Sequence, residues 1–518
     1  MNKATMGKLK GTNLYPAQIQ AIDFVRNSTK DIIGIRGDTG TGKTCLAFES
    51  VETPFFYVCS SINLQHQAES DYRKEAVLLK GRSNYDCDIF GTADLCMLKK
   101  RCGGCEYEDA KTAALKQYDM SILNFHYFLS AANFTKNFPI RNVIIDEADT
   151  LDTTLVDFIA FDFQLKALKN WGFKLDAPGK KTVISVVESW LDEVRYQCEG
   201  IIDKLSVEIG KIIGSATYGS LADWQMIKLR RWQRLKSLSW KLEVLTTQNL
   251  KQNWIYQYQD LVGREKVVLK PKWLSRELVD KFLLSHGKRF LLMSATLPAK
   301  PVLCGLFGLE AEEIDYIDLP NVWESNDRKV VYRGKYSLSY KDKSGDTDGI
   351  IKESVKEILK EHKGRGLIHT VNYKLSELME GLDDRLLVHN GKNKSEMFKE
   401  FLATPGAVFV SPSSTRGLDL PNELCEFIIM LKAPFLQLAD PQVKARLYGS
   451  GKFGTMWYTD DTIRTIIQAS GRGFRHEQDK CITFLLDKQI GRLLKESTVL
   501  WPLGFRDLIV MEEEVDEA

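Results

Sequence analysis

The fold is decided by the stretch Gly37-Asp38-Thr39-Gly40-Thr41-Gly42-Lys43-Thr44. An apolar run precedes it at residues 32–35, and the sequence CLAF that follows is typical of the start of a helix. Glycines in this spacing let backbone N–H groups turn toward a phosphate chain, at the positively polarised end of the helix. The alternative, a surface turn rich in Gly and Thr, is disfavoured by the strand before it, the helix after it and the final Lys-Thr pair. The stretch therefore predicts a loop that binds the phosphates of a nucleotide.

Each residue type in this loop suggests a role. Lys43 is predicted to reach the β- and γ-phosphates, and Thr44 to place its hydroxyl on Mg²⁺. The rest of the nucleotide cradle is predicted to be Thr39, Gly40, Thr41 and Gly42. Upstream, Gln18 has an amide that can both donate to and accept from an adenine edge, although a Gln near a helix start is often merely solvated.

Two acidic residues follow another apolar run, at residues 142–145. A carboxylate at a strand tip beside a phosphate loop can hold Mg²⁺, and a neighbouring one can orient or deprotonate the attacking water. We assign Asp146 the first role and Glu147 the second. The sequence Ser294-Ala295-Thr296 leaves a further predicted strand at residues 290–293, where its hydroxyls could bridge an acid to groups across a cleft.

Composition limits the class of protein. The chain has 518 residues with 44% hydrophobic content, enough for roughly three or four domain-sized units. Its net charge is only +2, so a nucleic-acid site must come from local clustering of cations. No apolar run is long enough for a membrane span and the first ten residues lack the core of a signal peptide, so the expected location is the cytoplasm. The acidic end of the chain is expected to be a solvated tail.

Residues 151–285 interrupt the alternation of strands and helices with a helical pattern. This predicted helical insertion contains cations interleaved with Trp224, Trp232 and Trp240. Such a mixture could bind single-stranded nucleic acid through phosphates and stacked bases. It could equally be a helix with Trp on the core side and Lys or Arg in water. The sequence favours neither interpretation.

A second series of apolar strands begins near residue 367 and predicts a second α/β domain that has no phosphate loop of its own. Its notable stretch is QASGRGFR, in which Gln468, Arg472 and Arg475 are predicted catalytic residues. Arginines three apart share one helical face and could neutralise the γ-phosphoryl group from across a cleft. Surface arginines are the plain alternative.

Taken in order, these motifs resemble the series of the superfamily 2 helicases: GDTGTGKT, SSINLQHQ, DEAD, SAT, SPSSTRGLDLP and QASGRGFR. Two further segments, KGRSNYDC at 80–87 and CEY at 105–107 with LNFHYFL at 123–129, resemble the borders of the iron-sulfur domain in the XPD/DinG family. The resemblance implies two RecA-like motor domains with parallel sheets, a small cysteine-ligated iron-sulfur domain and a helical Arch-like insertion. The implied boundaries are a first motor domain at 1–79, 108–150 and 286–298, an iron-sulfur domain at 80–107, an Arch-like insertion at 151–285 and a second motor domain at 299–518.

Four of the ten cysteines are clustered in the spacing C-x8-C-x5-C-x2-C, at Cys87, Cys96, Cys102 and Cys105. Four thiolates suit either zinc or an iron-sulfur cluster, and spacing alone does not choose between them. The family resemblance favours a 4Fe-4S cluster. The resemblance also assigns Gly417 and Asp419 of the fifth motif to the nucleotide site, although Arg416 stands where the family usually has Glu.

The resemblance implies a monomeric ATP-dependent DNA helicase that moves 5′ to 3′ on single-stranded DNA, with forked or tailed duplexes as substrates and repair or replication as the setting. Two other functions stay open. One is a translocase that moves without separating strands, and the other is a nucleic-acid-binding redox or damage sensor with an incidental ATPase. RNA as the track is also compatible, because backbone contacts dominate binding in such channels.

Overall fold

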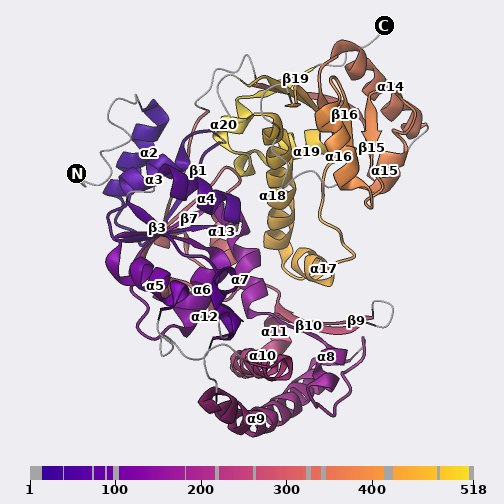
Figure 1. The fold of residues 1–518 in the computed structure, drawn as a ribbon. Coiled ribbons are helices and arrows are strands. Elements are labelled where there is room, and N and C mark those ends of the chain that lie inside the picture. The colour runs from indigo at the N-terminus through magenta and orange to yellow at the C-terminus, as the bar shows by residue number, and fades with distance from the viewer. Residues whose placement is uncertain are drawn as a thin grey trace.

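Two parallel sheets, each covered by helices, form the body of the protein, and a third unit projects from the first (Figure 1). The computed structural model describes residues 14–38, 40–72, 75–87, 90–96, 104–180, 182–215, 221–260, 264–321, 328–339, 346–412, 420, 424–474 and 479–512. Among these residues, no helix is long and apolar enough to cross a membrane.

The first sheet has the order β12-β1-β11-β7-β2-β6-β3, and all its pairs are parallel. Its five central strands are each built on an apolar run: β1 (Ile32–Arg36), β2 (Phe55–Cys59), β6 (Met120–Asn124), β7 (Arg141–Asp146) and β11 (Gly287–Ser294). The runs in β1, β7 and β11 are those predicted from the sequence. The two edge strands are β3 (Ala76–Leu78) and β12 (Ile314–Asp318).

The predicted boundary at residue 298 needs correction, because β12 pairs with β1 in the first sheet. The chain therefore stays in the first domain through α13 (Lys300–Phe307) and β12 before it crosses to the second. The reason for the error is that the edge strand IDYID carries two aspartates in five residues and buries only its first residue, unlike the mostly apolar and buried central strands.

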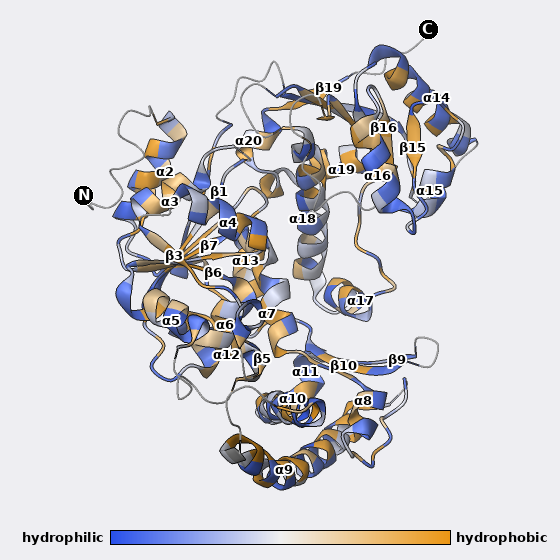
Figure 2. Cartoon of the chain, viewed as in Figure 1, coloured by the Kyte–Doolittle hydropathy of each residue, from blue (hydrophilic) through white to orange (hydrophobic). Residues whose placement is uncertain are grey.

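The first sheet is buried on both faces. Ile33 and Ile35 pack with α2 (Pro16–Asn27) and α3 (Lys43–Ser50), whereas Ile32 belongs to the larger core that includes α6 (Phe125–Phe134) and α7 (Leu151–Ile159). Figure 2 shows the strands of this sheet as almost uniformly hydrophobic. Continuous apolar strands of this kind are expected where helices cover both faces.

The unit that projects from the first domain contains the long helices α9 (Ile184–Ser215) and α10 (Asp223–Thr246). It is not wholly helical as predicted, because β8 (Phe161–Gln164), β10 (Glu265–Pro271) and β9 (Trp254–Asp260) form an antiparallel sheet in that order. At its two ends, α7 and α12 (Arg276–Phe282) join the core of the first domain.

The second sheet has the order β15-β16-β14-β17-β18-β13-β19, again with parallel pairs. The strands predicted from sequence are β14 (Gly366–His369), β15 (Leu386–Val388), β16 (Val408–Ser411), β17 (Phe427–Met430) and β18 (Cys481–Asp487). The sheet also holds β13 (Arg328–Tyr336) and β19 (Ile509–Met511). Two parallel, helix-covered sheets joined in this way are the predicted pair of RecA-like domains. The long helix α18 (Gly451–Ser470) of the second domain runs alongside the first (Figure 1).

Candidate nucleotide site between the two sheet domains

The phosphate loop lies between β1 and α3, as predicted. Gly40 and Gly42 have φ angles of 84° and 69°, a region that favours glycine because it has no Cβ. The Lys43 Nζ donates to the carbonyl oxygens of Gly37 and Asp38, each at 3.0 Å. The lysine therefore lies over its own loop, where it is available to phosphate oxygens. Thr39 lies outside the described residues.

Gln18 contacts this loop directly. Its Nε2 donates to the carbonyl oxygen of Thr41 at 2.8 Å, and its Oε1 accepts from the backbone N–H of Tyr15 at 2.9 Å. The side chain is buried. In this conformation Gln18 hydrogen-bonds to the phosphate loop and to the start of α2. Hydrogen bonding of Gln18 to the edge of an adenine stays a prediction.

Asp146 ends β7 and is linked to Thr44 through a residue that the sequence did not suggest. The Tyr57 hydroxyl donates to Asp146 Oδ2 at 2.5 Å and lies 3.4 Å from Thr44 Oγ1. Burial raises the pKa of Asp146 to about 6, the charge of Glu147 adds to this rise, and the Tyr57 hydrogen bond and Lys43 oppose it. Hydroxyl and carboxylate oxygens held this close together fit the preference of Mg²⁺ for oxygen ligands.

Glu147 is turned toward the edge of the sheet by an unusual backbone. Its φ of 54° lies in the left-handed region, which few residues other than glycine adopt. Its carboxylate accepts a hydrogen bond of 3.1 Å from Ser294 Oγ. The same hydroxyl lies 3.1 Å from Asp149 Oδ1, so one serine holds two acids of the DEAD stretch.

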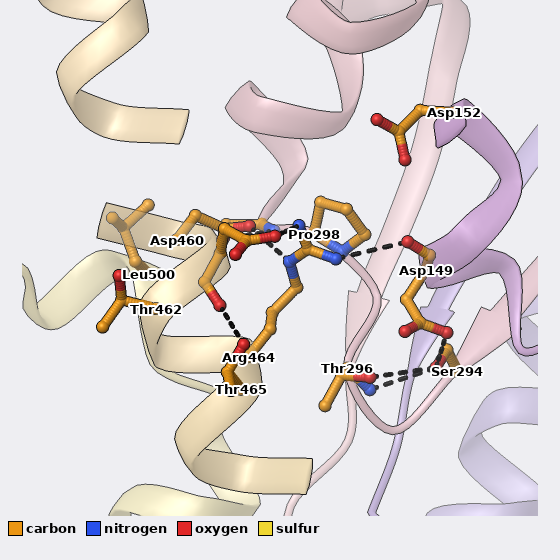
Figure 3. A network of polar contacts seen from close by, with 12 residues as sticks. Asp149, Asp152, Ser294, Thr296, Pro298, Asp460, Thr462, Arg464, Thr465 and Leu500 are labelled. Atoms are coloured by element: carbon orange, nitrogen blue, oxygen red, sulfur yellow. Dashed lines mark hydrogen bonds and ion pairs between the residues drawn. The ribbon is translucent and has the colours of Figure 1, made fainter. Parts of the chain in front are cut away.

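The second domain reaches these acids through α18. Gln468 Nε2 donates to Asp149 Oδ2 at 2.8 Å and to Thr296 Oγ1 at 3.0 Å. One turn earlier, Arg464 donates to the carbonyl oxygen of Asp149 at 3.2 Å (Figure 3). The SAT segment thus connects the acids of the first domain to a helix of the second, the bridge that its hydroxyls suggested.

Arg464 is held in place by acids on its own helix. It pairs with Asp460 at 2.9 Å and with Asp461 at 3.0 Å. Asp460 is fully buried and also accepts from the backbone N–H of Ala299 in the first domain, at 3.1 Å. Figure 3 shows the guanidinium extending from α18 toward Asp149. Because both partners are desolvated, this contact fixes the geometry of the seam between the domains.

Of the two predicted arginines, only Arg472 is among the described residues. Arg472 lies in the short turn after α18, and its charge adds to the effect of burial in lowering the pKa of His369 to about 3. Arg475 of the same stretch, and Gly417 and Asp419 of the fifth motif, lie outside the described residues.

The cysteine segment is described at Cys87, Cys96 and Cys105 but not at Cys102. Cys96 is buried with residues of α9 and α10, and Cys87 packs against the same small cluster, whereas Cys105 packs against the main core. Within the described part of the chain, no three potential metal ligands come together. A bound cluster or zinc therefore stays a prediction.

The basic and aromatic stretch of α10 is largely used inside the protein. Trp240 packs against Phe134, Phe158 and Phe282, and Lys228 pairs with Glu208 at 2.5 Å. Trp224 is 55% exposed, and the Lys228 Nζ lies 5.2 Å from the centre of its ring. The structure therefore favours the packing interpretation for most of this helix.

Three comparisons place the chain among known proteins. Residues 355–498 match the helicase C-terminal domain family. An XPD helicase structure shares 15% identity at a TM-score of 0.58, covering 96% of this chain and 98% of its own. An apo XPD structure shares 14% identity at a TM-score of 0.55, and the match covers 96% of this chain and 99% of that one. The structure of S. tokodaii Xpd4 shares 13% identity at a TM-score of 0.55, and the match covers 96% of this chain and 98% of that one. No curated protein sequence matches.

The fold has two parallel-sheet domains, with a phosphate loop in the first and a match to the helicase C-terminal domain family in the second. The fold of the chain is similar to that of the XPD helicase structures, so the predicted resemblance to the XPD/DinG family is confirmed at the level of the fold.

Proposed function

We propose that this protein is an ATP-dependent DNA helicase that hydrolyses ATP at the seam between its two RecA-like domains. One observation carries the proposal: a continuous set of hydrogen bonds runs from Glu147 through Ser294 and Asp149 to Gln468 of the second domain. A change at the phosphates can therefore be transmitted to the second domain, because the two sides share buried polar contacts.

The residues of the site have distinct proposed roles. Lys43 leaves its loop carbonyls for the β- and γ-phosphates, and Glu147 accepts a proton from the attacking water. Thr44 and Asp146 hold Mg²⁺, which when bound would neutralise phosphate charge. Arg472 belongs to the second domain and supplies positive charge at the seam. Arg475 is proposed to act with it.

The track is proposed to be single-stranded DNA, with 5′ to 3′ movement as the resemblance implies. The cysteine segment and the insertion form one surface, since Gln233 of α10 donates to the carbonyl oxygen of Asp94 at 3.0 Å. A strand that passes beneath this joint surface would be parted from its partner there. The four cysteines are proposed to hold a 4Fe-4S cluster, with zinc less favoured.

Two variants test the hydrolysis site. Lys43→Ala and Glu147→Gln are expected to abolish DNA-stimulated ATPase while leaving DNA binding within about twofold, because neither residue lies on the proposed track. Matched controls are Lys136→Ala and Glu357→Gln, which change exposed residues of the two sheet domains. Undiminished turnover by purified Glu147→Gln protein would refute the assignment of this site.

A second experiment separates the candidate functions. Forks with a 5′ DNA tail, a 3′ DNA tail or an RNA tail are incubated with and without ATP. Unwinding only of the 5′-tailed DNA fork supports the proposal, whereas ATP-driven movement without unwinding identifies a translocase.

Iron and sulfide near four per chain would support the cluster, and one zinc without sulfide would overturn it. A sensor would instead show DNA affinity that changes between the oxidised and reduced protein.

A further inference from the structure

A buried ion pair joins the phosphate loop to the second domain. Arg328, the first residue of β13, contacts both carboxylate oxygens of Asp38, with Nη2 to Oδ1 at 3.2 Å. Only 3% of the arginine side chain and 6% of the aspartate side chain are exposed. Asp38 is the second residue of the GDTGTGKT stretch. The contact therefore acts on the nucleotide loop itself.

The same guanidinium also contacts the arginine motif. Its Cζ lies 5.0 Å from the centre of the Phe474 ring, and Phe474 follows Arg472 and Gly473 in the stretch QASGRGFR. An arginine can do both at once, because its planar group donates along its edge and stacks on its face. Arg328 thus joins the phosphate loop to the motif proposed to supply positive charge to the phosphates.

The burial of this pair has an electrostatic consequence for ATP. A carboxylate in a phosphate loop would repel a polyphosphate, and Arg328 neutralises it at hydrogen-bonding distance. Removing the arginine alone would take its positively charged partner away from a buried carboxylate next to the nucleotide. Removing both charges would not.

We propose that Arg328 is a positioning residue for ATP hydrolysis, which holds the Arg472 segment against the phosphate loop by pairing with Asp38 and stacking on Phe474. This inference rests on the proposed function of the site. It gives Arg328 two separable effects: its charge permits ATP to bind, and its fixed geometry sets the rate of hydrolysis.

The test is a set of variants measured for nucleotide affinity and for kcat. Arg328→Gln is expected to weaken binding of a fluorescent ATP analogue and to lower kcat, each about tenfold or more, since loss of one partner of a buried charge pair has effects of that size. Asp38→Asn is expected to lower kcat with affinity retained. The double variant Asp38→Asn/Arg328→Gln is expected to recover affinity but not kcat.

Two further variants sharpen the test. Arg328→Lys keeps the charge but loses the paired donors and the stacking surface, so it is expected to restore affinity and not rate. Arg333→Gln is the matched control on the same strand. Arg333 lies 4.7 Å from the Phe484 ring and pairs with Glu361 and Glu512, all within the second domain. Its substitution is expected to leave both parameters unchanged.

The outcomes distinguish this inference from the proposed function. If Lys43→Ala abolishes ATP binding while Arg328→Gln leaves affinity and kcat unchanged, only the inference is overturned. If the Arg328→Gln protein fails to fold, Asp38→Asn still decides the matter, because an unchanged kcat in that variant contradicts a positioning role. A double variant with affinity as weak as Arg328→Gln alone would refute the electrostatic part.

Discussion

Asp146→Asn measures how much this buried carboxylate destabilises the folded protein. The native pKa of Asp146 is raised from 3.8 to about 6, chiefly by burial and then by the charge of Glu147. The folded protein therefore holds this proton more tightly than the unfolded chain between about pH 4 and pH 6, so the free energy of unfolding falls as the pH rises through that range. The loss is complete above the native pKa and amounts to about 3 kcal/mol, at 1.36 kcal/mol for each tenfold change in proton affinity.

The asparagine variant cannot ionise and can still accept the Tyr57 hydrogen bond. We expect it to be more stable than the wild type at pH 7.5 by up to about 3 kcal/mol, and the difference to shrink toward pH 4. Urea unfolding in EDTA at several pH values measures this difference, with Asp119→Asn, at an exposed residue beside the start of β6, as the control. Mg²⁺ at pH 7.5 should raise the wild-type midpoint only. A difference that does not change with pH would refute the reasoning.

The remaining predictions concern the proposed metal site, the contact of the second domain with the first, and the contact of the second domain with the unit that projects from the first. Tyr57→Phe should raise the Mg²⁺ concentration needed for half-maximal nucleotide binding by about 10- to 100-fold, because the lost hydroxyl orients Asp146, and a titration with a fluorescent analogue measures it. Gln468→Ala should lower kcat about tenfold or more with ATP affinity retained, as steady-state kinetics and binding would show, because it breaks contacts across the seam. The buried guanidinium of Arg446 lies 4.6 Å from the centre of the Trp273 ring. Arg446→Met should therefore lower the free energy of unfolding by about 2 kcal/mol or more and speed hydrogen exchange around Trp273. Unchanged exchange there would contradict a role of Arg446 in holding this contact.

The central strands of the first sheet share one property. Each of β1, β2, β6, β7 and β11 includes a buried apolar run that ends where polar residues begin. Burial on both faces leaves such a run in the sequence, and parallel strands place the polar residues that follow them at one edge. The phosphate loop, the acids and the SAT segment could therefore be assigned to one site without a structure.

The strands and residues that were missed lack this signal. β12 contains two aspartates in five residues and is only partly buried, and Tyr57 lies within the otherwise apolar sequence FFYVC. A hydroxyl in a buried strand that ends beside a phosphate loop is a usable sign in retrospect, because a buried phenol needs a partner. Arg464 stands four residues before Gln468, so helical spacing alone places both on one face of α18.

The sequence by itself determined the chemistry of the first domain, because the phosphate loop and the DEAD acids depend on local backbone geometry and on residue type over a few positions. Only the tertiary structure decided how the domains meet. Arg328 is far from Asp38 in the chain, and its burial in a charge pair depends on the packing of two sheets against each other. Pairing between distant side chains leaves no periodicity in a single sequence, since it is fixed by how whole elements pack.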